Sequence, residues 1–175
     1  MAEIFRQKNV VKLPERNKES KHDQYGKAQK GIVKCPYCGN VNFEKEWHGS
    51  IAELRKKKKD KKLKPSSEDI CPACKMIRNG LFEGELFVES IPKKYRKELL
   101  RLIKNYGKRD SEMDPQNRII AIEEMDGEIR ITTTENQLAN RLAKKIKGAF
   151  NKVKVDISFS EDPYEVNRVH AIFVE

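Results

Sequence analysis

Four cysteines in two matched pairs constrain this chain more than any other feature. Cys35 and Cys38 form the first pair and Cys71 and Cys74 the second, and a proline follows the first cysteine of each pair. Two thiolates separated by two residues can turn toward one point, so two such pairs can build a tetrahedral four-sulfur site. A closed site of this kind holds a structural metal and leaves no open coordination position for catalysis. The spacing therefore predicts a module built around one metal ion.

Zinc is the predicted metal, as one ion held by all four cysteines. The same knuckles resemble rubredoxin, an electron carrier with one iron, so iron stays open as an alternative. Rubredoxins are acidic and aromatic around the metal, whereas this chain is basic and has Lys75 after its second pair. A thioredoxin-type redox role would need one reactive pair within a larger α/β fold.

Two side chains after the first pair have more than one interpretation. Trp47 could stack on a nucleic-acid base, but the lone Trp of a small zinc module more often packs over the metal site, and we expect packing. His48 could replace a ligand, although four cysteines already complete the site.

The positive charge lies on one half of the chain. Residues 1–80 contain 20 Lys and Arg against 10 Asp and Glu, whereas residues 81–175 contain 17 of each, so the net charge of +10 belongs to the first half. Such asymmetry is typical of proteins that bind polyanions. The alternative is a solvated, Lys- and Glu-rich surface of the kind found in thermophiles.

A lysine-rich insertion separates the two cysteine pairs. It begins as a helix at Ile51 and ends before Pro65, and we expect its basic side chains to contact phosphates. The 32 residues between Cys38 and Cys71 exceed the usual ribbon spacing, which is tolerable because loop-closure entropy grows slowly with length. The candidate nucleic-acid-binding residues here are Arg55, Lys56, Lys57, Lys58, Lys59, Lys61, Lys62 and Lys64. A second, local strip on a later helix comprises Arg141, Lys144, Lys145 and Lys147, for which an ordinary solvated face is an equal alternative.

The predicted organisation has three parts. Residues 1–30 form a flexible basic arm, residues 31–88 a zinc-ribbon or treble-clef module with its lysine-rich insertion, and residues 89–175 a small domain. The fold class is α+β, and the last part is expected to be an α-β-β-α-β-β sandwich with helices on one face of its sheet.

Local patterns place the elements of that last part. A helix begins near Pro92 and is predicted to end at Gly107, followed by a polar linker over 108–116. Two strands joined by a turn follow over 118–132, and a helix opens at a capping box of Thr134 and Gln137. Leu138, Leu142 and Ile146 form its expected inner face, and strands near 153–157 and 169–173 complete the order.

Several classes of protein are disfavoured. No apolar run reaches the length of a membrane helix, and the first residues lack the apolar stretch of a signal peptide, so we expect a cytoplasmic protein without a membrane partner. No set of nucleophile, base and acid is recognisable, and no phosphate-binding glycine loop occurs. We therefore expect neither catalysis nor a small-molecule substrate.

Beyond these patterns, the chain resembles a known family over residues 21–175. The resemblance is carried by the two cysteine knuckles, His22-Asp23-x-Tyr25, the segment Cys74–Asn79, Gly84-Glu85-Leu86, Arg118-Ile119-Ile120-x-Ile122-Glu123 and Ile131-Thr132-Thr133-Thr134. The family consists of small bacterial zinc-binding proteins of unassigned function. These are similar in turn to the N-terminal zinc region of the Nmd-three proteins, the archaeal and eukaryotic adaptors that export the large ribosomal subunit.

The resemblance implies association with the ribosome or its RNA, with the four cysteines as zinc ligands. The Nmd-three adaptors carry further cysteine pairs that this chain lacks, so only part of their binding surface is expected here. The predicted function is a zinc-stabilised, non-catalytic RNA-binding protein. An iron electron carrier and a protein–protein adaptor with a basic loop remain the alternatives, and the oligomeric state is left open.

Overall fold

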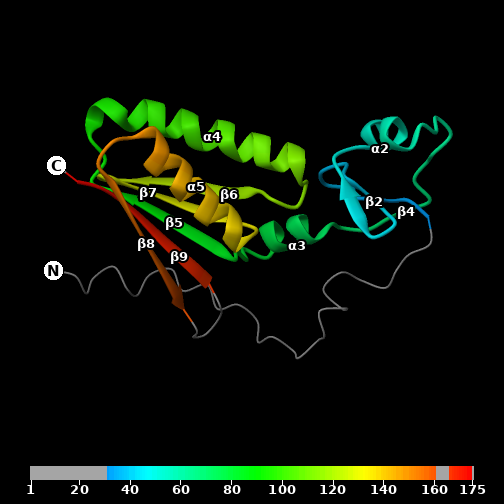
Figure 1. Cartoon of the computed structure of the whole chain (residues 1–175). Helices are drawn as coiled ribbons and strands as arrows, with labels where there is room; N and C mark the ends of the chain where they lie inside the picture. The colour runs from blue at the N-terminus through cyan, green and yellow to red at the C-terminus, as the bar shows by residue number, and fades with distance from the viewer. Residues whose placement is uncertain (1–30, 161–165, 175) are drawn as a thin grey trace.

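The computed structural model describes residues 31–160 and 166–174, which form a mixed α+β structure with two sheets and four α-helices (Figure 1). The predicted arm, residues 1–30, lies outside the described residues. In chain order the elements are β1 Val33–Lys34, β2 Val41–Phe43, β3 Glu46–His48, α2 Ile51–Lys58, β4 Ser67–Glu68, α3 Pro72–Arg78, β5 Gly84–Glu89, the 3₁₀ turn η1 Lys93–Tyr95, α4 Arg96–Met113, β6 Ile119–Met125, β7 Glu128–Thr133, α5 Asn136–Ala149, β8 Val153–Ser160 and β9 Val166–Phe173.

Residues 31–81, which we name the cysteine module, contain the smaller sheet. Its strand order is β3-β2-β1-β4, with β1, β2 and β3 antiparallel and β4 parallel to β1. Helix α2 starts at the predicted position, where the Ser50 side chain caps the backbone N–H of Glu53. It ends at Lys59, which adopts a left-handed conformation with φ of 54°. Helix α3 ends at Arg78, and Gly80 lies just beyond it with φ of +64°.

The larger sheet has the order β6-β7-β5-β9-β8, and we name residues 84–174 the five-stranded unit. Strand β5 lies at its centre, antiparallel to β7 and parallel to β9. Because β7 separates β5 from β6, the segment β5-α4-β6 is a split β-α-β unit. The predicted domain boundary after residue 88 runs through β5, whose partners place it in the five-stranded unit. The sandwich order predicted for residues 89–175 omitted this strand.

One apolar core fills the space between the larger sheet and helices α4 and α5, which cover one face (Figure 1). Leu138, Leu142 and Ile146 are fully buried, which confirms the predicted inner face of α5. The aromatic side chains of Tyr95, Phe150 and Phe173 close one end of this core. Sixteen buried residues belong to this cluster, so the five-stranded unit has the core of an ordinary small domain.

Helix α4 continues through Gly107 to Met113, so the predicted stop at Gly107 and the predicted linker over 108–116 are wrong. The glycine has a packing role instead of a capping role. A β-carbon at Gly107 would lie 2.4 Å from Cδ1 of Ile119, so a larger residue here would require the Ile119 side chain to move.

The predicted capping box at Thr134 is also wrong, because α5 begins at Asn136 and Glu135 occupies the N-cap without a side-chain hydrogen bond. The Thr134 hydroxyl accepts from the backbone N–H of Arg118 at 2.8 Å and donates to the Gln116 carbonyl at 2.6 Å. Thr134 therefore secures the chain entering β6, a long-range contact that competes with the local cap.

Candidate metal centre and basic surfaces

The first cysteine pair lies in a tight knuckle between β1 and β2. The backbone N–H of Cys35 donates to the Asn40 carbonyl at 2.7 Å, and the N–H of Gly39 donates back to the Cys35 carbonyl at 2.9 Å. Gly39 has φ of +77°, a conformation that a residue with a β-carbon rarely adopts. The knuckle turns the chain so that the sulfurs of Cys35 and Cys38 face the same interior point.

The second pair opens helix α3. Cys71 is the N-cap, and its sulfur accepts from the backbone N–H of Cys74 at 3.4 Å. The Cys71 N–H donates to the Cys35 sulfur, also at 3.4 Å. Pro72 occupies the first helical position, where a missing N–H costs nothing. The helix start therefore sets both sulfurs of this pair toward the knuckle.

The four sulfurs of Cys35, Cys38, Cys71 and Cys74 all lie within 4.8 Å of one another. The sulfurs of Cys38 and Cys71 are 3.7 Å apart, and all four cysteines are free of disulfides. Metal–sulfur bonds of about 2.3 Å in a regular tetrahedron place the sulfurs about 3.8 Å apart, whereas a disulfide bond is about 2.05 Å long. This arrangement is compatible with a single metal ion held by all four cysteines.

The surroundings give the thiols different acidities. Burial would raise the pKa of Cys35, but hydrogen bonds from the backbone N–H groups of Cys71, Cys38 and Tyr37 outweigh it and lower this pKa to about 6. Burial raises the pKa of Cys71 well above its ordinary value, and it raises the pKa of Cys74. A metal cation bound by these sulfurs would stabilise the thiolate forms and so counteract the effect of burial on Cys71 and Cys74.

Arg118, which precedes β6, extends its guanidinium to the edge of the four-sulfur site. Its Nη1 lies 3.6 Å from the Cys74 sulfur, and its Nε donates to the Pro115 carbonyl at 2.8 Å. With the Asn40 amide oriented to satisfy its neighbours, Asn40 Oδ1 accepts from Arg118 Nη2 at 2.7 Å. Burial would lower the pKa of Arg118, but the cysteine sulfurs together raise it. A fixed positive charge thus lies beside a site that becomes strongly negative when its thiols ionise.

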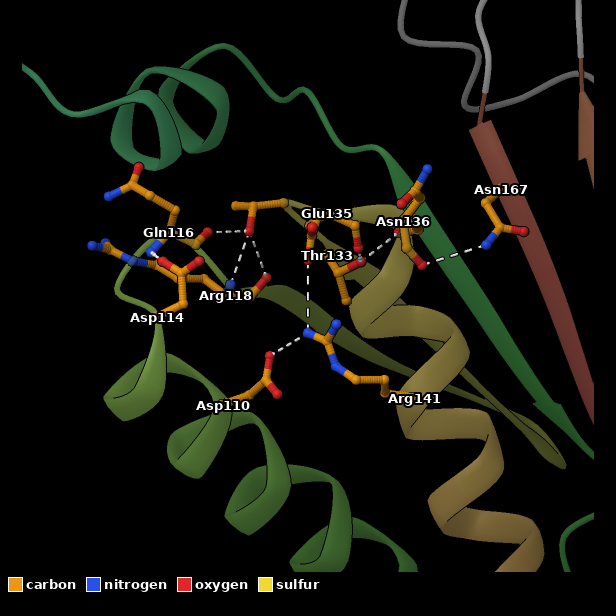
Figure 2. Close-up of polar contacts among 11 residues, drawn as sticks. Asp110, Asp114, Gln116, Arg118, Thr133, Glu135, Asn136, Arg141 and Asn167 are labelled. Carbon is orange, nitrogen blue, oxygen red and sulfur yellow. Dashed lines mark hydrogen bonds and ion pairs between the residues drawn. The ribbon is translucent and has the colours of Figure 1, made fainter. Parts of the chain in front are cut away.

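The segment from Asp114 to Arg118 connects the cysteine module to the five-stranded unit (Figure 2). The Gln116 side-chain oxygen accepts from the backbone N–H of Ala73 at 3.1 Å, in the first turn of α3. The backbone carbonyl of Gln116 accepts a hydrogen bond from the hydroxyl of Thr134, which belongs to the five-stranded unit. The short connection therefore contacts both halves of the molecule.

Two further expectations concern the side chains near the site. Trp47 packs against the buried cysteine cluster, which confirms the predicted packing role. His48 is buried outside the group of sulfur ligands, and burial, followed by the nearby charge of Lys57, lowers its pKa.

The basic insertion projects from the cysteine module, and its members differ in what they contact. Arg55 donates to the Leu63 carbonyl at 2.9 Å, so it holds the loop closed. Lys57 pairs with Glu46 at 3.4 Å and Lys58 with Glu44 at 2.7 Å. Within this insertion, whose residues are all described, the exposed lysines without an ion pair are Lys56, Lys59, Lys61, Lys62 and Lys64, which we name the free lysine group.

Several of these side chains surround a hollow at the end of α2. Its volume is about 430 Å³, and it is lined by Arg55, Lys56, Lys59 and Lys61. Its surface consists mainly of the apolar stems of these side chains, so the hollow itself does not show that their charged groups converge on one point.

The second predicted strip, on α5, divides in the structure. Arg141 is half-buried and pairs with Asp110 at 2.6 Å, which ties α5 to α4, and with Glu135 at the start of α5 at 3.7 Å (Figure 2). Lys144, Lys145 and Lys147 are exposed. The C-terminal end of α5 and helix α2 lie at opposite ends of the molecule (Figure 1). The two basic surfaces therefore do not form one continuous patch.

No protein-family model, curated protein or solved structure gives a significant match to this chain. Among the described residues, none of the helices combines the length and the apolar character needed to span a bilayer.

Proposed function

We propose that this protein is a zinc-stabilised, non-catalytic RNA-binding protein with a treble-clef-like zinc finger, and that ribosomal RNA is its first candidate target. The observation that carries the proposal is the free lysine group, five exposed cations on an insertion anchored at both ends by the metal ligands. A metal-held base reduces the entropy lost when such an insertion binds a polyanion. The choice of ribosomal RNA rests on the resemblance to the Nmd-three proteins.

The zinc assignment is supported by the closed set of four thiolates and by the neighbouring guanidinium. A zinc ion with four thiolates carries a net charge of about −2, and Arg118 offsets part of it. Aerobically purified protein should be colourless and contain one zinc per chain. Strong visible absorption from bound iron would overturn the assignment and favour an electron carrier.

The RNA proposal makes a quantitative prediction about salt. If the free lysine group neutralises about five phosphates, the logarithm of the binding constant should fall against the logarithm of salt concentration with a slope of about −3.5 to −4.5. Binding to ribosomal RNA fragments, followed by fluorescence anisotropy at several salt concentrations, measures this slope. A binding constant that is insensitive to salt contradicts the proposal.

A matched pair of variants locates the contact. Changing the free lysine group to glutamine should weaken RNA binding by a factor of about a hundred or more at moderate salt and bring the slope close to zero. Changing Lys144, Lys145 and Lys147 to glutamine removes charge from the far end of the molecule and should leave binding nearly unchanged. If the α5 variant lost RNA binding and the variant of the free lysine group kept it, the RNA contact would lie on α5. Association that survives nuclease treatment would instead indicate an acidic protein partner.

A further inference from the structure

Strand β8 forms one edge of the larger sheet, with β9 on its inner side and no other described strand on its outer side. The pairing of β8 with β9 is continuous from Val153 to Ser160, so the strand carries no bulge that would bend its edge away. A long, regular edge strand presents unpaired backbone groups to another strand.

The hydrogen-bond pattern shows which backbone groups face outward. The N–H of Val174 donates to the Lys152 carbonyl at 2.8 Å, which makes residues 152 and 174 a hydrogen-bonded pair of the antiparallel ladder. Along an antiparallel edge strand, successive residues direct their backbone N–H and carbonyl groups alternately toward the paired strand and away from it. Lys154 and Asp156 therefore direct their backbone N–H and carbonyl groups toward β9, whereas Val153, Val155 and Ile157 direct theirs toward the free edge.

We propose that β8 is a homodimer interface, in which the β8 strand of a second copy pairs antiparallel so that Val155 lies opposite its own symmetry mate. This register hydrogen-bonds the outward groups of Val155 to each other, and those of Val153 to Ile157 of the second copy. The same alignment places Lys154 opposite Asp156 of the second copy, twice across the two-fold axis. These two Lys154–Asp156 pairs are at non-hydrogen-bonded positions of the ladder, where opposite side chains approach most closely.

Charge selects this register over its neighbours. Shifting the two-fold axis to residue 154 places two lysines opposite each other, and shifting it to residue 156 places two aspartates together. An axis at Val153 sets Lys152 against Lys154 on both sides. Like charges directly opposite destabilise a strand pair, whereas opposite charges stabilise it. Lys154 and Asp156 are both exposed, so they are accessible to a second strand.

The other face of β8 supports the same alignment. Val153 is buried and Val155 is half-buried, but Ile157 is 47% exposed, one of the few large apolar side chains at the surface of the described residues. In the proposed register Ile157 lies beside Val153 of the second copy, which would cover part of its surface. A single strand pair buries little area, so we expect a weak, concentration-dependent dimer.

The test uses charge exchange at the edge. Sedimentation equilibrium of the full chain should show a monomer–dimer equilibrium, and Lys154→Asp and Asp156→Lys should each weaken the dimer by about tenfold or more, because each converts both attractive pairs into repulsive ones. The double variant Lys154→Asp/Asp156→Lys should regain dimerisation to within a few-fold of the unmodified chain.

Mixing the two single variants provides the most specific readout. One variant then carries two aspartates and the other two lysines, so in the proposed register they should form a heterodimer that is tighter than the homodimer of either variant alone. Circular dichroism checks that each variant is folded. A chain that stays monomeric up to roughly 500 µM, single variants that dimerise like the unmodified chain, or a mixture that stays monomeric would each overturn the proposal.

Discussion

The cysteine module and the five-stranded unit are comparable in their mixture of strands and helices but differ in what holds them together. The five-stranded unit has sixteen buried residues in one apolar cluster. The cysteine module has a cluster of three, Ile32, Val41 and Leu54, and a second made of the cysteines and Ala73. Clusters this small bury too little apolar surface to offset the conformational entropy of fifty residues. The comparison indicates that the proposed metal would contribute far more to the stability of the cysteine module than to that of the five-stranded unit.

The largest expected effect is therefore loss of the metal. Removing it with a strong chelator, or changing Cys71 to serine, should unfold the cysteine module and leave the five-stranded unit folded, since structural zinc contributes on the order of 10 kcal/mol to small modules. Trp47, the one tryptophan of the chain, packs against the cysteine cluster and reports on this module by its fluorescence. Amide hydrogen exchange reports on the folding of the five-stranded unit. Amide protection that disappears from β5 and β7 together with the module would contradict this separation, and added zinc should reverse the effect of the chelator.

A pair of leucines tests the same contrast with smaller changes. Leu142 and Leu54 are both fully buried, the first in the large core and the second in the small cluster. Leu142→Ala should lower the free energy of unfolding of the five-stranded unit by about 3 kcal/mol and leave the metal-dependent fluorescence of Trp47 unchanged. Leu54→Ala should instead weaken metal binding. Urea unfolding followed by circular dichroism, beside a zinc titration, measures both. If either substitution affected both halves equally, the two would be one cooperative unit.

The smallest effect is expected at the junction. Arg118→Met removes the positive charge beside Cys74 and the contact to Asn40, so the dissociation constant for zinc should rise by about tenfold. Competition with a chromophoric chelator measures this change. Arg96→Met is the matched control, because Arg96 pairs with Glu124 on the side of α4, away from the sulfurs. An equal effect of both variants would show that the change is a general loss of charge.

The success and failure of the sequence patterns follow from the range of the interactions behind them. The start of helix α2 was predicted well because helix caps act within a few positions. Gly107 was misread as a helix end, since its packing against Ile119 is a tertiary contact that no local pattern contains. The same reason applies to Thr134, whose hydroxyl contacts the chain entering β6.

Strand β5 shows a different failure. Its run Leu86-Phe87-Val88 is short and flanked by charged residues, so it carried a weak strand signal, although the structure puts it at the centre of the sheet.

No pattern in the sequence indicated that Arg118 lies beside the sulfur site, because it is 44 positions away from Cys74. Of the predicted basic residues, Arg55, Arg141, Lys57 and Lys58 have partners within the chain, which a list of charges does not reveal.

By itself, the sequence determined that four cysteines would form one set of candidate ligands, that positive charge would gather in the first half, and that α5 would bury one face. These follow from residue type and spacing, which act locally. Only the tertiary structure decided which lysines remain free, where β5 lies, and how Arg118 connects the sulfurs to the sheet. Such contacts join residues distant in the chain, so they exist only once the two halves have folded against each other.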